Sequence, residues 1–119
     1  MSLVADLAAK PGVIAAGQYS YRGDRFTFKG DLDAECARMA SIMCRATTMS
    51  ATMASRTAAS LTQEDEGFVP LRGWILRGAR LTICVVANVF CMLDNETASL
   101  DAVVKDMQHH LGVAPDEMV

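Results

Sequence analysis

Two cysteines in the most apolar stretch of the chain, Cys84 and Cys91, are the residues whose type and spacing best suit chemistry. A two-residue turn at positions 87–88 would place Cys84 opposite Cys91 on neighbouring strands. Counted from that turn, the two fall at a hydrogen-bonded pair, where Cα atoms lie ~5.5 Å apart. Paired thiols suit redox or sulfur-carrying chemistry, but nothing nearby in the sequence activates a thiolate. The simpler interpretation is two buried thiols that pack as small apolar residues.

The other candidates for chemistry give no further site. The four cysteines have no C-x-x-C spacing, which favours free thiols in a reducing compartment. His109 and His110 are adjacent, so on a helix they point about 100° apart, and no third ligand has a suitable spacing. The sequence has no Gly-rich phosphate loop and no Ser/His/Asp set. We therefore expect no catalytic residues, no metal, no cofactor and no enzymatic activity.

Composition limits the class of protein. The 119 residues, 51% of them hydrophobic, predict one domain over residues 1–119. The net charge is −3 and the 11 basic residues are scattered, which disfavours nucleic acid as a partner. No run of about 18 apolar residues and no secretory segment is present, so we expect a cytoplasmic protein without a membrane association.

The stretch from Phe68 to Asn95 must position the two cysteines. Its Val, Ile, Leu, Phe and Trp residues, broken at glycines and at 87–88, predict three consecutive antiparallel strands. The middle strand, Leu81 to Val86, is apolar on both faces, so other elements must cover both faces of the sheet. The first strand, Phe68 to Arg77, contains Pro70, which lacks an N–H and indicates an edge. An apolar edge strand is a pairing hazard unless another chain covers it, which predicts dimerisation there.

The remaining segments predict the covers. A short helix over Leu3 to Ala8 ends at Pro11-Gly12, and a long helix without Gly or Pro runs from Asp31 to about Gln63. Between and after them we expect a hairpin, an acidic loop and a final helix that Gly112 stops. Their ranges are Val13 to Ser20 and Arg25 to Lys29 for the hairpin strands, Glu64 to Gly67 for the loop and Thr97 to Leu111 for the helix.

The long helix has a feature that a purely structural role does not require. About 33 residues would span ~50 Å, which is longer than a five-residue strand can cover. Its surplus length favours a second face for a partner, and methionine adapts to irregular surfaces. The alternative is that its small residues simply fill space under a tight core. One stripe of the helix carries Leu32, Cys36, Met39, Met43, Ala46, Ser50, Met53, Thr57 and Leu61.

The order of elements, with several short motifs, resembles the roadblock or dynein-light-chain superfamily of profilin-like sandwiches. The motifs are Pro11-Gly12-Val13, Gly23 in the first hairpin, the long helix before the acidic loop, and Asp94-Asn95 before the last helix. Gly73-Trp74, Gly78 and the turn from Cys84 to Val89 are similar to a small, uncharacterised bacterial branch that occurs beside heterodisulfide-reductase-like sulfur-oxidation enzymes.

The resemblance implies an α+β fold: a five-stranded antiparallel sheet, with the long helix on one face and both terminal helices on the other. It also implies a homodimer joined at the strand after the long helix, and a scaffold or regulator of a small Ras-like GTPase or a multiprotein complex. A thiol-containing accessory of sulfur metabolism that uses Cys84 and Cys91 is the alternative function. The expected dimer interface comprises Phe68, Leu71, Gly73, Trp74, Ile75, Leu76, Met43 and Met53.

Overall fold

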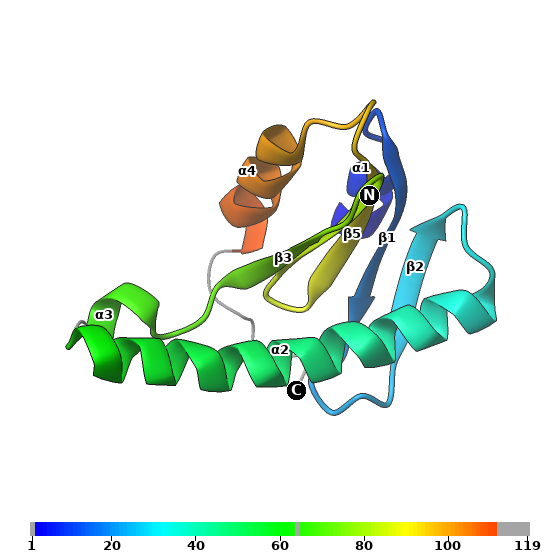
Figure 1. Ribbon diagram of the computed structural model, residues 1–119. Helices are drawn as coiled ribbons and strands as arrows, with labels where there is room; N and C mark the ends of the chain where they lie inside the picture. The colour runs from blue at the N-terminus through cyan, green and yellow to red at the C-terminus, as the bar shows by residue number, and fades with distance from the viewer. Residues whose placement is uncertain (1, 64, 112–119) are drawn as a thin grey trace.

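The computed structural model describes residues 2–63 and 65–111, and for residues 65 and 66 it describes the backbone alone. Five antiparallel strands form one sheet in the order β2-β1-β5-β4-β3 (Figure 1). The order of elements along the chain confirms the α+β fold expected from the sequence. Their bounds are α1 Leu3–Ala8, β1 Val13–Tyr19, β2 Phe26–Gly30, α2 Ala34–Thr62, α3 Asp65–Phe68, β3 Gly73–Arg77, β4 Leu81–Val86, β5 Val89–Asp94 and α4 Leu100–Leu111.

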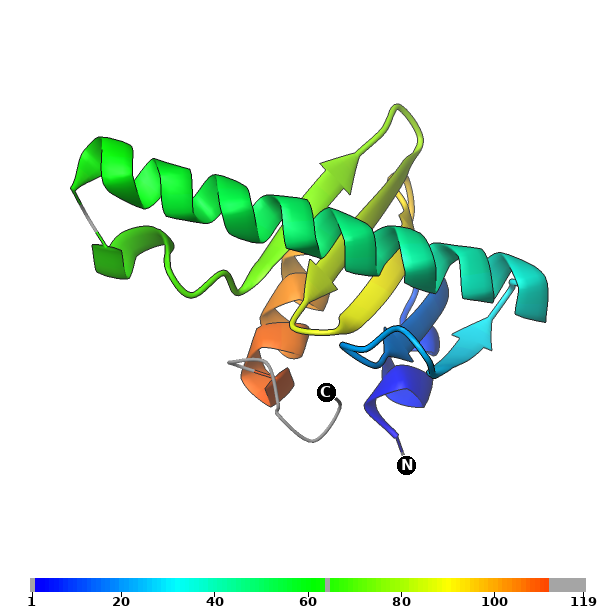
Figure 2. The same ribbon diagram turned by 90° about the horizontal axis from the view of Figure 1, so that it is seen from below.

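Each face of the sheet has its own apolar cluster, because β4 and β5 place alternate side chains on opposite sides. On one face, Val4 and Leu7 of α1 and Val103 and Met107 of α4 pack on the strands. On the other face, Tyr19, Cys44, Val85 and Phe90 form the cluster beneath α2. The predicted layering, with α2 on one side and the two terminal helices on the other, is confirmed (Figures 1 and 2).

Helix α2 is continuous over its 29 residues. It begins where the Asp33 carboxylate accepts the Cys36 N–H at 2.7 Å, as expected of a helix N-cap. A helix of this length spans about 44 Å. It crosses the sheet and extends well beyond it, and α3 lies beside its far end (Figure 2).

The β4–β5 hairpin has the predicted register, with Cys84 opposite Cys91 and Val85 opposite Phe90. Its turn is held from both sides. The Ala87 N–H donates to the Arg72 carbonyl, and the buried Asn88 side chain donates to the Tyr19 carbonyl at 2.8 Å. The turn that sets the cysteine pair is therefore fixed by tertiary contacts as well as by its own residues.

The segment after α2 differs from the prediction. Residues 65–68 form the short helix α3 instead of a solvated loop, and the strand begins at Gly73 instead of Phe68. Pro70 lacks an N–H and cannot donate to a ladder, and the pairing with β4 begins at Gly73. The predicted stop at Gly112 lies outside the described residues. Within the described part of the chain, no helix has the length and apolar character needed to cross a membrane.

Candidate interaction surface

Strand β3 is the last strand at one side of the sheet, and only β4 pairs with it among the described residues. Ile75 is 52% exposed and Leu76 is 55% exposed, on opposite faces of the strand. The described part of β3 therefore offers a row of backbone donors and acceptors flanked by apolar side chains, which is the arrangement that invites strand addition.

The outer face of α2 forms a second apolar surface. Small residues face the sheet, namely Ala37, Ser41, Cys44, Ser55 and Ala59. They let the helix lie close to the bulky side chains of the strands. The methionines consequently lie outside, within about 120° of helical arc at 100° per residue. This α2 outer face comprises Met39, Ile42, Met43, Met49 and Met53, all of them exposed.

Trp74, one of the residues of the predicted dimer interface, packs its side chain between β3 and α2. Its indole N–H donates to the Thr48 hydroxyl at 2.8 Å, and the same hydroxyl hydrogen-bonds to the Tyr19 phenol at 3.0 Å. Burial raises the pKa of Tyr19 to about 12, although the bond with Thr48 acts in the opposite sense. Thr48 was not singled out in the sequence, because a single threonine in a helix carries no pattern. It fixes α2 above the edge of the sheet.

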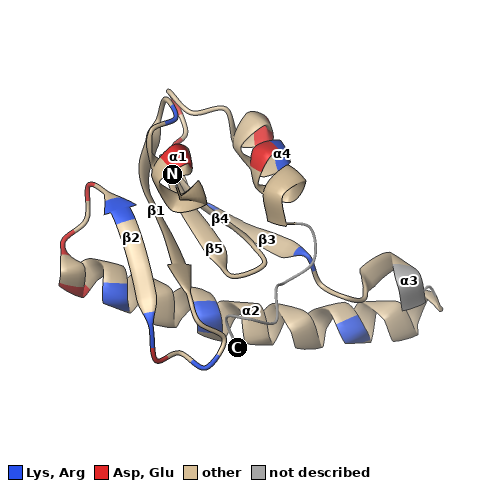
Figure 3. Ribbon diagram, turned by 180° about the vertical axis from the view of Figure 1, so that it is seen from behind, with Lys and Arg blue, Asp and Glu red and all other residues tan. Residues whose placement is uncertain are grey.

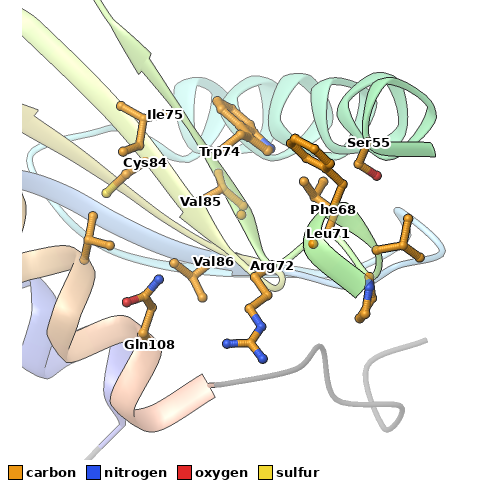
Figure 4. A pocket seen from close by; sticks show the side chains of 15 residues that line it. Ser55, Phe68, Leu71, Arg72, Trp74, Ile75, Cys84, Val85, Val86 and Gln108 are labelled. Atoms are coloured by element: carbon orange, nitrogen blue, oxygen red, sulfur yellow. The ribbon is translucent and has the colours of Figure 1, made fainter. Parts of the chain in front are cut away.

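A groove of about 540 Å³ runs along the start of β3, between the end of α2 and α4 (Figure 4). Apolar side chains from residues 68–71 form one wall, and Trp74 and Ile75 continue it. Val104 and Gln108 contribute from α4. Among the described residues that line this groove, Arg72 is the only charged one. Phe68, Leu71, Gly73, Trp74 and Ile75, five of the predicted interface residues, therefore meet in one place, whereas Met43 and Met53 lie apart on α2.

The two paired cysteines are free thiols in the core, with Cys84 at 1% and Cys91 at 0% exposed. The Cys84 thiol contacts the Met107 sulfur at 3.8 Å. The hydrogen bond from Cys91 lowers the pKa of Cys84, whereas the same bond and then burial raise the pKa of Cys91. Because both cysteines are buried in the apolar cluster that includes Val103 and Met107 of α4, the arrangement favours packing over exchange with a partner.

The remaining groups add no reactive site within the described residues. Cys36 is exposed, but the hydrogen bond and charge of Asp33 raise the pKa of its thiol. No group of three or more His, Cys, Asp or Glu side chains that could hold a metal occurs among residues 2–63 and 65–111. His110 Nδ1 instead lies 2.9 Å from the Asp106 carbonyl oxygen. Basic positions are spread over β2, α2 and α4 rather than gathered on one element (Figure 3).

Comparison with known proteins places this geometry in a family. The family model described as "Uncharacterized conserved protein (DUF2173)" matches residues 4–109. No curated protein matches the chain. Among solved structures, the chain is similar to a Roadblock/LC7 domain from Streptomyces avermitilis, with a TM-score of 0.54 and 16% identity over 93% of this chain and 96% of that one.

A second similar structure is Myxococcus xanthus MglB, with a TM-score of 0.57 and 14% identity over 82% of this chain and 76% of that one. At these identities the likeness concerns the fold, and it confirms the predicted roadblock-type architecture. The chain belongs to the family described as Uncharacterized conserved protein (DUF2173), and its fold is that of the roadblock superfamily.

Proposed function

We propose that this chain is a single-domain, non-enzymatic interaction module of the cytoplasm, which forms a homodimer and regulates or scaffolds a small Ras-like GTPase or a larger protein complex. The observation that carries the proposal is the unpaired side of β3 in the described chain, with Ile75 and Leu76 exposed beside it. Covering such a surface with another strand lowers the free energy, because backbone groups become paired and apolar area is removed from water.

A two-fold axis beside β3 would satisfy this edge with a second copy of the same chain. Antiparallel pairing of β3 with its symmetry mate would use the free backbone groups on both sides and join the two sheets. Because α2 crosses the sheet on one face, the two copies of α2 would then lie on the same face of the joined sheet. The α2 outer face, including Met43 and Met53, would be available to the second helix and to a partner.

The type of partner follows from the α2 outer face and from the roadblock fold. Flexible, polarizable methionine side chains suit a surface that binds another protein without a rigid match of shape. GTPase regulation is the role that the roadblock resemblance implies, and the exposed helix offers a surface for it. A scaffold in a larger complex would use the same surface.

The thiol alternative has one supporting observation, since Cys84 borders the groove beside Ile75 and Val104. This role needs sulfur atoms that a partner can reach. If the thiols carry out redox or sulfur-carrying chemistry, replacing both Cys84 and Cys91 by alanine should abolish the function of the protein in the source organism. If the chain works by binding partners through its surfaces, the same replacement should leave that function intact.

Affinity capture from the source organism under reducing conditions tests the proposed function. The bait is the wild-type chain, and its matched variants are Met43→Gln with Met53→Gln and Met43→Leu with Met53→Leu. We expect a P-loop GTPase or a defined complex to bind the wild type and the leucine variant, because leucine keeps the apolar area, and to be lost from the glutamine variant. Recovery of iron–sulfur or flavin sulfur enzymes that is insensitive to these changes would contradict the proposal.

A further inference from the structure

The groove along residues 67–75 is exposed and apolar in the described chain, and its position suggests what covers it. Phe68, Val69 and Ile75 are exposed large hydrophobic residues along its wall. We infer that the groove binds the chain's own segment after α4, residues 113–118, through apolar contacts and a charge pair with Arg72. This inference goes beyond the proposed function and does not depend on dimerisation.

The described chain ends beside the groove. Val104 and Gln108 of α4 already line the groove, and Leu111 follows Gln108 by one helical turn. The chain therefore leaves α4 at the wall of the groove. Six residues in extended form reach about 20 Å, which is enough to follow a groove of this size.

The segment after α4 complements the groove in charge and in apolar character. Of the groove-lining residues that the structure describes, Arg72 alone is charged, and the others are mostly apolar. The segment 113–118 reads Val-Ala-Pro-Asp-Glu-Met, with two acidic residues, no basic residue and apolar residues at either side. Arg72 points away from β3 toward the side of the groove on which α4 ends (Figure 4). A carboxylate from this segment would give Arg72 a partner of opposite charge.

The test compares full-length variants by amide hydrogen exchange over residues 67–72. Reversing the segment's charges (Asp116→Lys with Glu117→Lys) should speed exchange there roughly two- to fivefold, since exposed charge pairs contribute modestly. Arg72→Glu should have the same effect, and combining the two sets should restore the wild-type rate. Arg77→Glu, at the last residue of β3 and not among the residues that line the groove, is the matched control and should change nothing.

Unchanged exchange after the charge reversal, or a combined variant that loses protection additively instead of regaining it, would overturn the inference. The same measurement at several protein concentrations identifies another occupant. Protection that rises with concentration and ignores the segment's charges would mean that a second copy fills the groove. Light scattering on the same samples records the oligomeric state throughout.

Discussion

Replacement of Ile75 and Leu76 by serine should break the proposed homodimer without unfolding the chain. Ile75 is 52% exposed and Leu76 is 55% exposed. Full burial of such a side chain contributes at least about 1.5 kcal/mol, so covering the exposed half contributes at least about 0.8 kcal/mol per side chain to the free energy of association. A two-fold dimer holds four such side chains. Their loss therefore removes about 3 kcal/mol, and the dissociation constant should rise at least roughly a hundredfold.

Sedimentation velocity over a range of protein concentrations measures this change directly, and circular dichroism verifies that the variant keeps its fold. Leu81→Ser is the matched control, because Leu81 has a similar exposure of 42% but lies at the start of β4, beyond the end of its pairing with β3. A folded double variant that dimerises as tightly as the wild type would refute the edge-pairing reasoning. Trp74 is a poorer probe of the edge, since its indole is bonded to Thr48 and its loss would also disturb α2.

Three further predictions concern the packing that holds α2 and β3 in place. Thr48→Val should lower the free energy of unfolding by about 1–3 kcal/mol in urea denaturation, because it leaves the Trp74 N–H and the Tyr19 hydroxyl without their shared partner. An unchanged free energy of unfolding would mean that these two hydrogen bonds make no net contribution to stability. Gly73→Ala should lower the same quantity by about 1–3 kcal/mol, since a Cβ there would overlap the Val85 carbonyl oxygen, and an unchanged urea midpoint would contradict that close approach. Tyr19→Phe should remove part of the loss of stability at alkaline pH. The pKa of the Tyr19 phenol is near 10 in the unfolded chain and about 12 in the folded one. The free energy of unfolding of the wild type should therefore fall by up to about 2 kcal/mol between pH 10 and pH 12, and that of the variant should not.

The β4–β5 hairpin shows what local sequence could predict. Continuous apolar runs on either side of positions 87–88 predict two strands, and a two-residue turn at those positions sets Cys84 opposite Cys91. Helix α2 was predictable for a similar reason, because an acidic N-cap precedes a long stretch without Gly or Pro. In both elements the local signals agree with the tertiary structure.

Other features depend on tertiary contacts that no local pattern records. Residues 65–72 combine acidic, apolar and proline residues, and the structure divides them between α3 and a connection to β3. The stripe of residues that includes Met39, Met43 and Met53 marks one face of α2, but the sequence pattern does not indicate whether that face contacts the sheet. The structure shows that the small residues of α2 are the buried ones, and that α2 packs through them against the cluster of Tyr19 and Phe90. The groove could not be predicted from the sequence, because it forms where α4 meets residues that are distant from it along the chain and no local sequence motif marks it.

The pairing of β3 with its own copy is the central claim, and an isotope-filtered NOE experiment on a mixed sample of labelled and unlabelled chains tests it most directly. We predict contacts between the backbone of β3 in one copy and β3 in the other, with Ile75 and Leu76 side chains among the nearest neighbours across the interface. Contacts between copies that involve only α2 or α4, or no contact between copies at concentrations where the chain is fully folded, would contradict the account.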